Sequence, residues 1–160
     1  MQTAALAETC LLTEEETLLI RPLGFQLGSS TRCDVSAIYD LGEEVGRSFT
    51  HGPLFEISPY LVEIQGIQQI ILGFDESDVL DAVSLTLDSE LFNPITTLLG
   101  HHYELANSNE PVPGSHSALF RRVNSEVSVH VPLIGAEMNL SYQTEKFMSA
   151  RMKAASDAMN

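Results

Sequence analysis

Four carboxylates lie close together in the middle of the chain, where they could bind calcium or a basic partner. They are Asp75, Glu76, Asp78 and Asp81. A calcium loop of the EF-hand type needs a glycine at its sixth position and a bidentate glutamate at its twelfth. Counted from Asp75, the sixth position is not glycine and the twelfth is Thr86. The cluster therefore predicts an acidic hairpin turn without a metal, whose carboxylates are candidate contacts for a basic partner.

Histidines could supply acid–base or metal chemistry, but their spacing favours neither. His101 and His102 are adjacent, so on a helix they point about 100° apart and cannot easily share an ion. The other three, His51, His116 and His130, fall in predicted loops or on the polar face of a strand. We therefore predict no catalytic residues, no metal, no cofactor and no enzyme activity. An enzyme with a scattered active site around His51, His101 or His116 is the less favoured alternative.

The two cysteines, Cys10 and Cys33, fit either one disulfide or two separate thiols, and two sulfurs alone make no zinc site. Residues 1–7 end in small residues that are typical of a secretory cleavage site. If they are a signal remnant, a Cys10–Cys33 disulfide could close in an oxidising compartment and stabilise the fold by roughly 3 kcal/mol. We therefore expect a periplasmic or secreted protein, with a cytoplasmic location as the alternative.

Charge limits the kinds of partner. The chain has 22 acidic and 8 basic residues, a formal net charge of −14, and no Lys or Arg between Arg47 and Arg121. Such a balance disfavours nucleic acids and anionic membranes and favours a basic protein. Unless the fold brings the ends over the middle, one face must be continuously negative, so Glu56 and Glu63 join the candidate binding residues. No apolar run is long enough to span a membrane.

The elements that position these residues follow from periodicity and capping. Ser29 to Thr31 can cap a helix that ends near Gly42, and Asn93-Pro94 can open a second helix that ends by Tyr103. The apolar segments predict strands at Pro53–Ser58, Ile64–Phe74, Val79–Leu87, Ala118–Val123, Val127–Val131 and Glu137–Gln143. Ala106–Ser117 reads as a loop, and residues 144–160 as a C-terminal helix.

This order of elements predicts an α+β fold in a single domain over residues 1–160. We expect two layers, an antiparallel sheet with helices on one face, so that the other face forms a broad platform. Residues 29–87 and 93–143 share an order of one helix followed by three strands. They are therefore candidates for two tandem α-β-β-β units that build one continuous sheet.

A stripe of apolar residues marks the C-terminal helix. Met148, Met152, Ala155 and Met159 fall on one helical face. The stripe could pack against the domain's own sheet or dock onto a partner, because methionine adapts to varied surfaces. Of the two, we favour packing on the sheet.

One segment resembles a known family. Leu27-Gly28, followed by Val35, Gly42 and then strands, is similar to the helix opening of small bacterial envelope proteins, the family of the outer-membrane-assembly lipoprotein BamE and the β-lactamase inhibitor proteins. The motif covers residues 23–45, and the rest of the chain resembles the family only in element order. The resemblance implies a protein-binding module in the envelope, with no catalytic residues to carry over. The chain departs from the family in having one possible disulfide and no convincing lipidation cysteine.

Together these observations predict a non-enzymatic, acidic protein-binding module. The leading interpretation is an exported inhibitor, immunity protein or envelope assembly protein that engages a basic partner. The alternative is a cytosolic secretion chaperone or antitoxin-like binding protein, which would carry free thiols and form a stable dimer.

Overall fold

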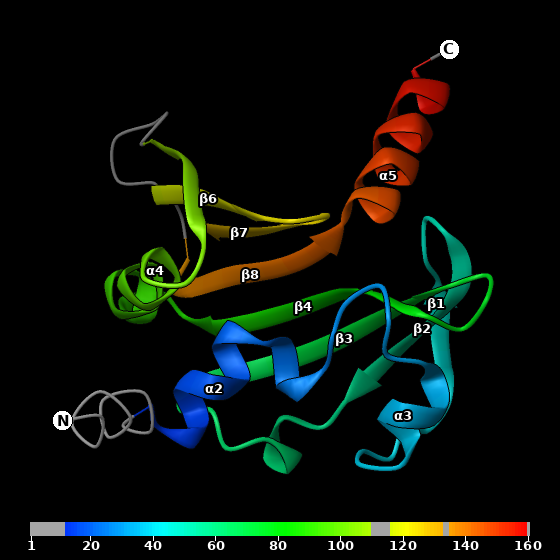
Figure 1. The fold of residues 1–160 in the computed structure, drawn as a ribbon, viewed down its shortest axis with the longest axis horizontal. Helices are drawn as coiled ribbons and strands as arrows, with labels where there is room; N and C mark the ends of the chain where they lie inside the picture. Colours follow the sequence, from blue (N-terminus) through cyan, green and yellow to red (C-terminus); the bar gives the residue numbers. More distant parts are fainter. Residues whose placement is uncertain (1–11, 110–115, 133–134, 160) are drawn as a thin grey trace, which may run out of the picture.

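The strands form one antiparallel sheet in the computed structural model, which describes residues 12–109, 116–132 and 135–159 (Figure 1). The strands are β1 (Glu44–Arg47), β2 (His51–Ile57), β3 (Ile67–Asp75), β4 (Leu80–Asp88), β5 (Glu104–Asn109), β6 (His116–Arg122), β7 (Ser125–Val131) and β8 (Glu137–Thr144). The helices are α2 (Glu14–Ile20), α3 (Arg32–Ser36), α4 (Phe92–Gly100) and α5 (Glu145–Ala158), with 3-10 turns η1 (Pro22–Gly24), η2 (Pro59–Leu61) and η3 (Ser89–Leu91). The predicted α+β class and antiparallel sheet are confirmed.

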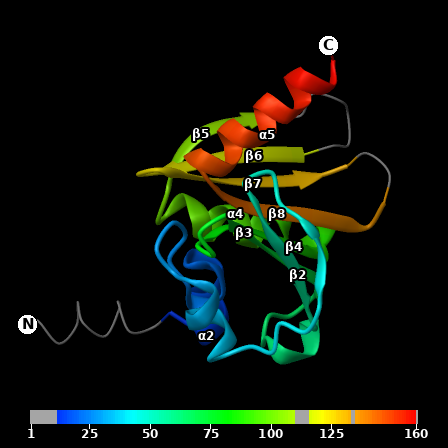
Figure 2. The same cartoon turned by 90° about the vertical axis from the view of Figure 1, so that its right-hand side faces the viewer.

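The sheet has the strand order β1-β2-β3-β4-β8-β7-β6-β5. Each half of the chain contributes a run of consecutive strands, and the last strands of the two halves, β4 and β8, pair in the centre with Leu85 opposite Leu140. Viewed from the end, β5 to β8 lie across the top of the fold and α2 lies beneath them (Figure 2). Each half contributes four strands where three were predicted, and the two tandem α-β-β-β units stay a prediction.

Two of these strands were not predicted. β1 pairs with β2, and β5 pairs with β6 at the other edge, with Asn107 opposite Leu119. The prediction of a loop over Ala106–Ser117 is therefore wrong for the residues that belong to β5 and β6. Edge strands are held by hydrogen bonds to one neighbour, so they need no alternating apolar side chains, and these two show none.

The core lies on one face of the sheet. Ile70, Leu85, Leu140 and Val129 stand side by side across β3, β4, β8 and β7, and all are at most 1% exposed. On the opposite face, Ser84, Ser141 and Ser128 form the adjacent cross-strand row. Because side chains alternate along a strand, this register separates an apolar inner face from an outer face of small polar residues.

Helices α2 and α4 cover the inner face. The carbonyl of Leu19 in α2 accepts a hydrogen bond from the buried Tyr142 hydroxyl, and α4 buries Ile95 and Leu99 in the core. In contrast, Phe147, the only fully buried residue of α5, lies against Gly73 on the outer face. The predicted arrangement of the helices on one face is therefore wrong for α5.

Helix starts follow the expected chemistry in part. The Thr31 hydroxyl accepts from the Asp34 N–H at 3.3 Å, and the Asp34 carboxylate accepts from the Thr31 N–H at 2.8 Å, so Thr31 is the cap among the predicted candidates. The helix that it opens, α3, ends at Ser36, well before the predicted stop at Gly42. Asn93 is not the cap of the second helix, because η3 leads directly into α4, which begins at Phe92.

No helix among the described residues is long and apolar enough to cross a membrane.

Candidate functional site

The β3–β4 hairpin holds the acidic cluster in a tight turn. Asp75 accepts hydrogen bonds from the N–H groups of Ser77 at 2.8 Å and Val79 at 3.0 Å, and Asp78 takes the left-handed backbone conformation with φ 61°. Burial alone would raise the pKa of Asp75, but these N–H groups and the Lys146 ammonium together hold that pKa below its usual value. The hairpin predicted from the sequence is present, and Asp75 is part of its structure.

Basic residues from both ends of the chain reach this hairpin. The Lys146 ammonium, at the start of α5, lies 3.0 Å from Asp75 Oδ2 and 2.8 Å from Glu76 Oε1, and Arg32 lies 3.8 Å from Asp78. The hydrogen bonds to Lys146 lower the pKa of Glu76, and those carboxylates raise the pKa of Lys146. The fold therefore brings the ends over the middle, and these hairpin acids do not form an uncompensated negative face.

Asp81 differs from the other hairpin acids because it is buried. It is the extra residue of a β-bulge, since Gly73 pairs with Ala82 and Phe74 with Leu80. Its side chain is 2% exposed, and neither carboxylate oxygen has a hydrogen-bond partner in the described part of the chain. Burial raises the pKa of Asp81 from its ordinary value to about 6. Asp81 is thus a feature of the interior and not a surface contact.

The Thr50 hydroxyl lies beside Asp81 and acts to lower its pKa. That hydroxyl, however, lies 3.3 Å from the Phe74 carbonyl oxygen and 2.9 Å from the Ser48 hydroxyl. The Thr50 hydroxyl therefore has other oxygen neighbours besides Asp81.

The remaining two candidate acids lie elsewhere. Glu56 is exposed on β2, opposite Ile71 of β3, and Glu63 is exposed between η2 and β3. Because β3 runs from Ile67 to Asp75, Glu63 lies at the end of the strand that is opposite to the hairpin. The structure therefore brings together the four acids that are close in sequence and places Glu56 and Glu63 apart from them.

Helix α5 leaves the sheet after its first turn. Figure 1 shows it rising from the end of β8 and pointing away from α2 and α3. Its base is fastened by Lys146 and by Phe147, whose ring lies edge-to-face with Phe49 at 5.7 Å. Beyond Phe147, no residue of the described helix is fully buried. The one buried residue of the described helix therefore lies in its first turn, and Met148, Ala150 and Ala154 are half-buried.

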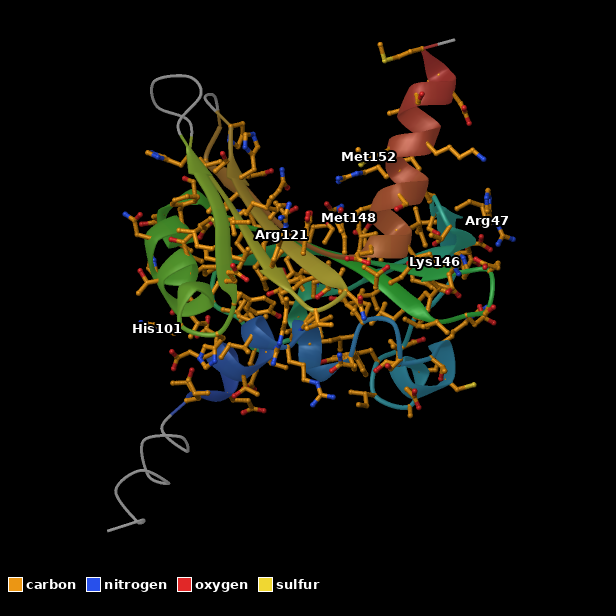
Figure 3. All side chains as sticks on the ribbon, turned by 45° about the horizontal axis from the view of Figure 1, so that its top comes forward. Arg47, His101, Arg121, Lys146, Met148 and Met152 are labelled. Carbon is orange, nitrogen blue, oxygen red and sulfur yellow. The ribbon has the colours of Figure 1, made fainter. Side chains whose placement is uncertain are left out.

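The methionine stripe, defined as Met148, Met152, Ala155 and Met159, is exposed except at Met148, which is half-buried. Met152 is 67% and Met159 88% exposed, and Figure 3 shows Met148 and Met152 along the helix above Lys146. At about 100° per residue, the stripe lies roughly a third of a turn from Phe147. The prediction that the stripe packs on the domain's own sheet is therefore wrong. Phe147, which is not part of the stripe, contacts the sheet instead.

The histidines and the described cysteine show no assembled chemistry. Among residues 12–109, 116–132 and 135–159, no group of three or more His, Cys, Asp or Glu side chains could hold a metal ion. His101 caps the C-terminal end of α4, and His51 and His130 are exposed on strands. The Cys33 thiol is free and exposed in α3, whereas Cys10, its predicted partner, lies outside the described residues.

Comparison of the chain with protein-family models, with curated proteins and with solved structures finds no match.

Proposed function

We propose that this chain is a non-enzymatic protein-binding module that docks a partner through the methionine stripe of α5. The observation that carries the proposal is the exposure of Met152 and Met159 on a helix whose one buried residue, Phe147, lies at its base. Soluble proteins rarely project a helix with an apolar stripe unless something covers it. Burial of a methionine side chain stabilises by about 1.5–3 kcal/mol, so the stripe offers a useful gain on binding.

The partner that fits best is a basic protein with an apolar groove. The groove would accept the stripe, whose unbranched side chains adapt to irregular surfaces. The net charge of −14 would attract a basic protein over the whole surface, and Glu56 and Glu63 have no ion-pair partner among the described residues. Such attraction mainly speeds encounter, so association should slow as salt increases.

Export is the second part of the proposal. The resemblance of residues 23–45 to the BamE-like envelope proteins and the character of residues 1–7 support a periplasmic or secreted location. Protein purified from its native compartment would then contain a Cys10–Cys33 disulfide, and reduction would add two hydrogens to its intact mass. Two free thiols would instead support the cytosolic chaperone or antitoxin-like alternative, in which the stripe still binds a partner.

The decisive experiment compares capture by three forms of the chain. Wild type, the double variant Met152→Glu and Met159→Glu, and the control Ser149→Glu are immobilised and exposed to the same native lysate. Ser149 is exposed on α5 about a quarter of a turn from the stripe, so its variant adds charge without touching the stripe. We expect a protein that wild type and Ser149→Glu retain and the stripe variant loses. Equal retention by all three forms would refute docking through α5.

A further inference from the structure

A cavity with an apolar floor and a cationic mouth lies on the side of the fold where α2 ends. Its volume is about 440 Å³, within the range of small-molecule sites. Its floor includes Phe25, Val127 and Tyr142, each at most 4% exposed. Arg21 and Arg122 line its mouth. Segments from both halves of the chain meet here, so the cavity is a property of the fold and not of one motif.

The charge of the cavity lining is opposite to that of the chain. Of the eight Lys and Arg residues, Arg21, Arg122 and Lys146 line it, against the two carboxylates Glu126 and Glu145. Lys146 is engaged by the hairpin acids, and Glu126 is paired with Arg121 at 3.1 Å. Two guanidinium groups therefore remain against one carboxylate, in a chain whose net charge is −14.

The geometry holds one of these guanidinium groups in place. The Arg122 guanidinium lies 5.3 Å from the centre of the Tyr103 ring, and the Tyr103 hydroxyl donates to the Ile20 carbonyl at 2.6 Å. Stacking on an anchored ring limits the freedom of the arginine, so less entropy is lost when it binds a ligand. Neither Arg21 nor Arg122 forms an ion pair with a carboxylate among the described residues.

From this arrangement we propose that the cavity binds an organic anion, a carboxylate attached to an apolar group. The apolar group would contact the half-buried lining residues Ile20, Leu27 and Tyr103, and the carboxylate would accept hydrogen bonds from the guanidinium groups at the mouth. Inorganic phosphate does not fit, because it would leave these apolar residues uncovered. This site is distinct from the methionine stripe, so its failure would leave the proposed protein-binding function unaffected.

A titration of the full chain, followed by the backbone amide signals in NMR, tests the site. The probes are 3-phenylpropionate, its neutral analogue 3-phenylpropanamide, and inorganic phosphate. We expect 3-phenylpropionate to shift the signals of residues 21–29 and 122–127 saturably. The amide should bind at least about tenfold more weakly because it lacks the charge that the arginines recognise. Equal binding of acid and amide, or saturation of the same signals by phosphate, would overturn the proposal.

Variants of the two arginines separate binding from folding. Arg122→Gln and Arg21→Gln should each weaken binding of 3-phenylpropionate, whereas Arg151→Gln, on exposed α5 and outside the cavity, should not. Arg122→Gln could lower the melting temperature, because Tyr103 loses its stacked partner. In that case the affinity of Arg21→Gln for 3-phenylpropionate still tests the site. Its side chain is exposed and makes no ion pair in the described structure. Unchanged affinity in Arg21→Gln and Arg122→Gln would contradict the proposal.

A carboxylate attached to an apolar group could belong to a free aromatic acid or to the C-terminal residue of a peptide. N-acetyl-Ala-Phe with a free carboxylate distinguishes them, with its C-terminal amide as the control. Tighter binding of the dipeptide than of 3-phenylpropionate would identify a peptide terminus, and weaker binding a small free acid. Binding of either supports the site, and binding of neither refutes it.

Discussion

Helices α4 and α5 each carry an apolar stripe, but the two stripes have different surroundings. α4 buries Ile95 and Leu99 in the core under the sheet, whereas the longer α5 buries only Phe147 and leaves Met152 and Met159 in solvent. A helix of this length is only marginally stable in water on its own. The comparison shows that an amphipathic stripe identifies an apolar surface that favours burial. The stripe alone does not indicate whether it is buried against the same chain or against a partner.

The largest effect should come from the core side of this comparison. Leu99→Ala removes a side chain that is fully buried and should lower the free energy of unfolding by about 2–5 kcal/mol. Met152→Ala, on the exposed stripe, should change it by less than about 0.5 kcal/mol. Urea denaturation of the two variants measures both. Similar losses would mean that the stripe is packed in the free protein.

Asp81 should give the next largest effect, and the effect should depend on pH. The folded-state pKa of about 6 lies above the ordinary value of 3.8, so the ionised form is disfavoured in the folded protein. Wild type should lose stability as pH rises from about 4 to 6, by up to about 3 kcal/mol. Asp81→Asn lacks this titration, so its stability relative to wild type should increase over the same interval.

Unfolding midpoints between pH 4 and 8 provide the measurement for Asp81→Asn. Glu56→Gln is the matched control, because Glu56 is exposed on β2. A difference between Asp81→Asn and wild type that stays constant over this pH range would show that Asp81 is not buried as an unpaired carboxylate.

A smaller effect is expected where α5 is fastened to the body. Lys146→Met removes both ion pairs to the hairpin, but Lys146 is half exposed, so the loss should be at most about 1 kcal/mol. Because partly exposed ion pairs are screened, the difference from wild type should shrink in high salt. Urea denaturation in low and high salt measures it. A salt-independent loss would indicate a packing defect instead.

Removing the projecting part of α5 should also have a small effect on stability. Truncation after Met148 keeps Lys146 and Phe147 and removes residues that are not fully buried. The free energy of unfolding should change by less than about 1 kcal/mol, as urea denaturation would measure, while partner capture is lost. A loss of folding in this truncated form would contradict the separation of α5 from the core.

Much of the sheet could be predicted because its strands bury alternate residues. β7 illustrates this, since Val127, Val129 and Val131 are buried and lie between polar neighbours. The edge strands β1 and β5 could not be predicted, because backbone pairing at a sheet edge needs no side-chain pattern. Asp81 interrupted the alternation of its strand in the sequence, and the structure gives the reason, a β-bulge. That interruption was a usable signal of irregular geometry.

The candidate site was less predictable, because its contacts join distant parts of the chain. The acidic hairpin was visible in the sequence, but its partner Lys146 lies 71 positions from Asp75. No local pattern announces such a contact. The same is true of the cavity, whose floor takes Phe25 from the first part of the chain and Tyr142 from β8. The pairing of basic residues near the chain ends with acidic residues in the middle could therefore be found only from the structure.

Amide hydrogen exchange on the isolated protein, at a concentration where light scattering shows a monomer, tests the central claim most directly. Residues 149–158 of α5 should exchange quickly, because none of them is buried, while Ile95 and Leu99 in α4 should be strongly protected. Addition of a partner isolated by the stripe-dependent capture should then slow exchange in α5. Protection of α5 equal to that of α4 in the free monomer would contradict the account.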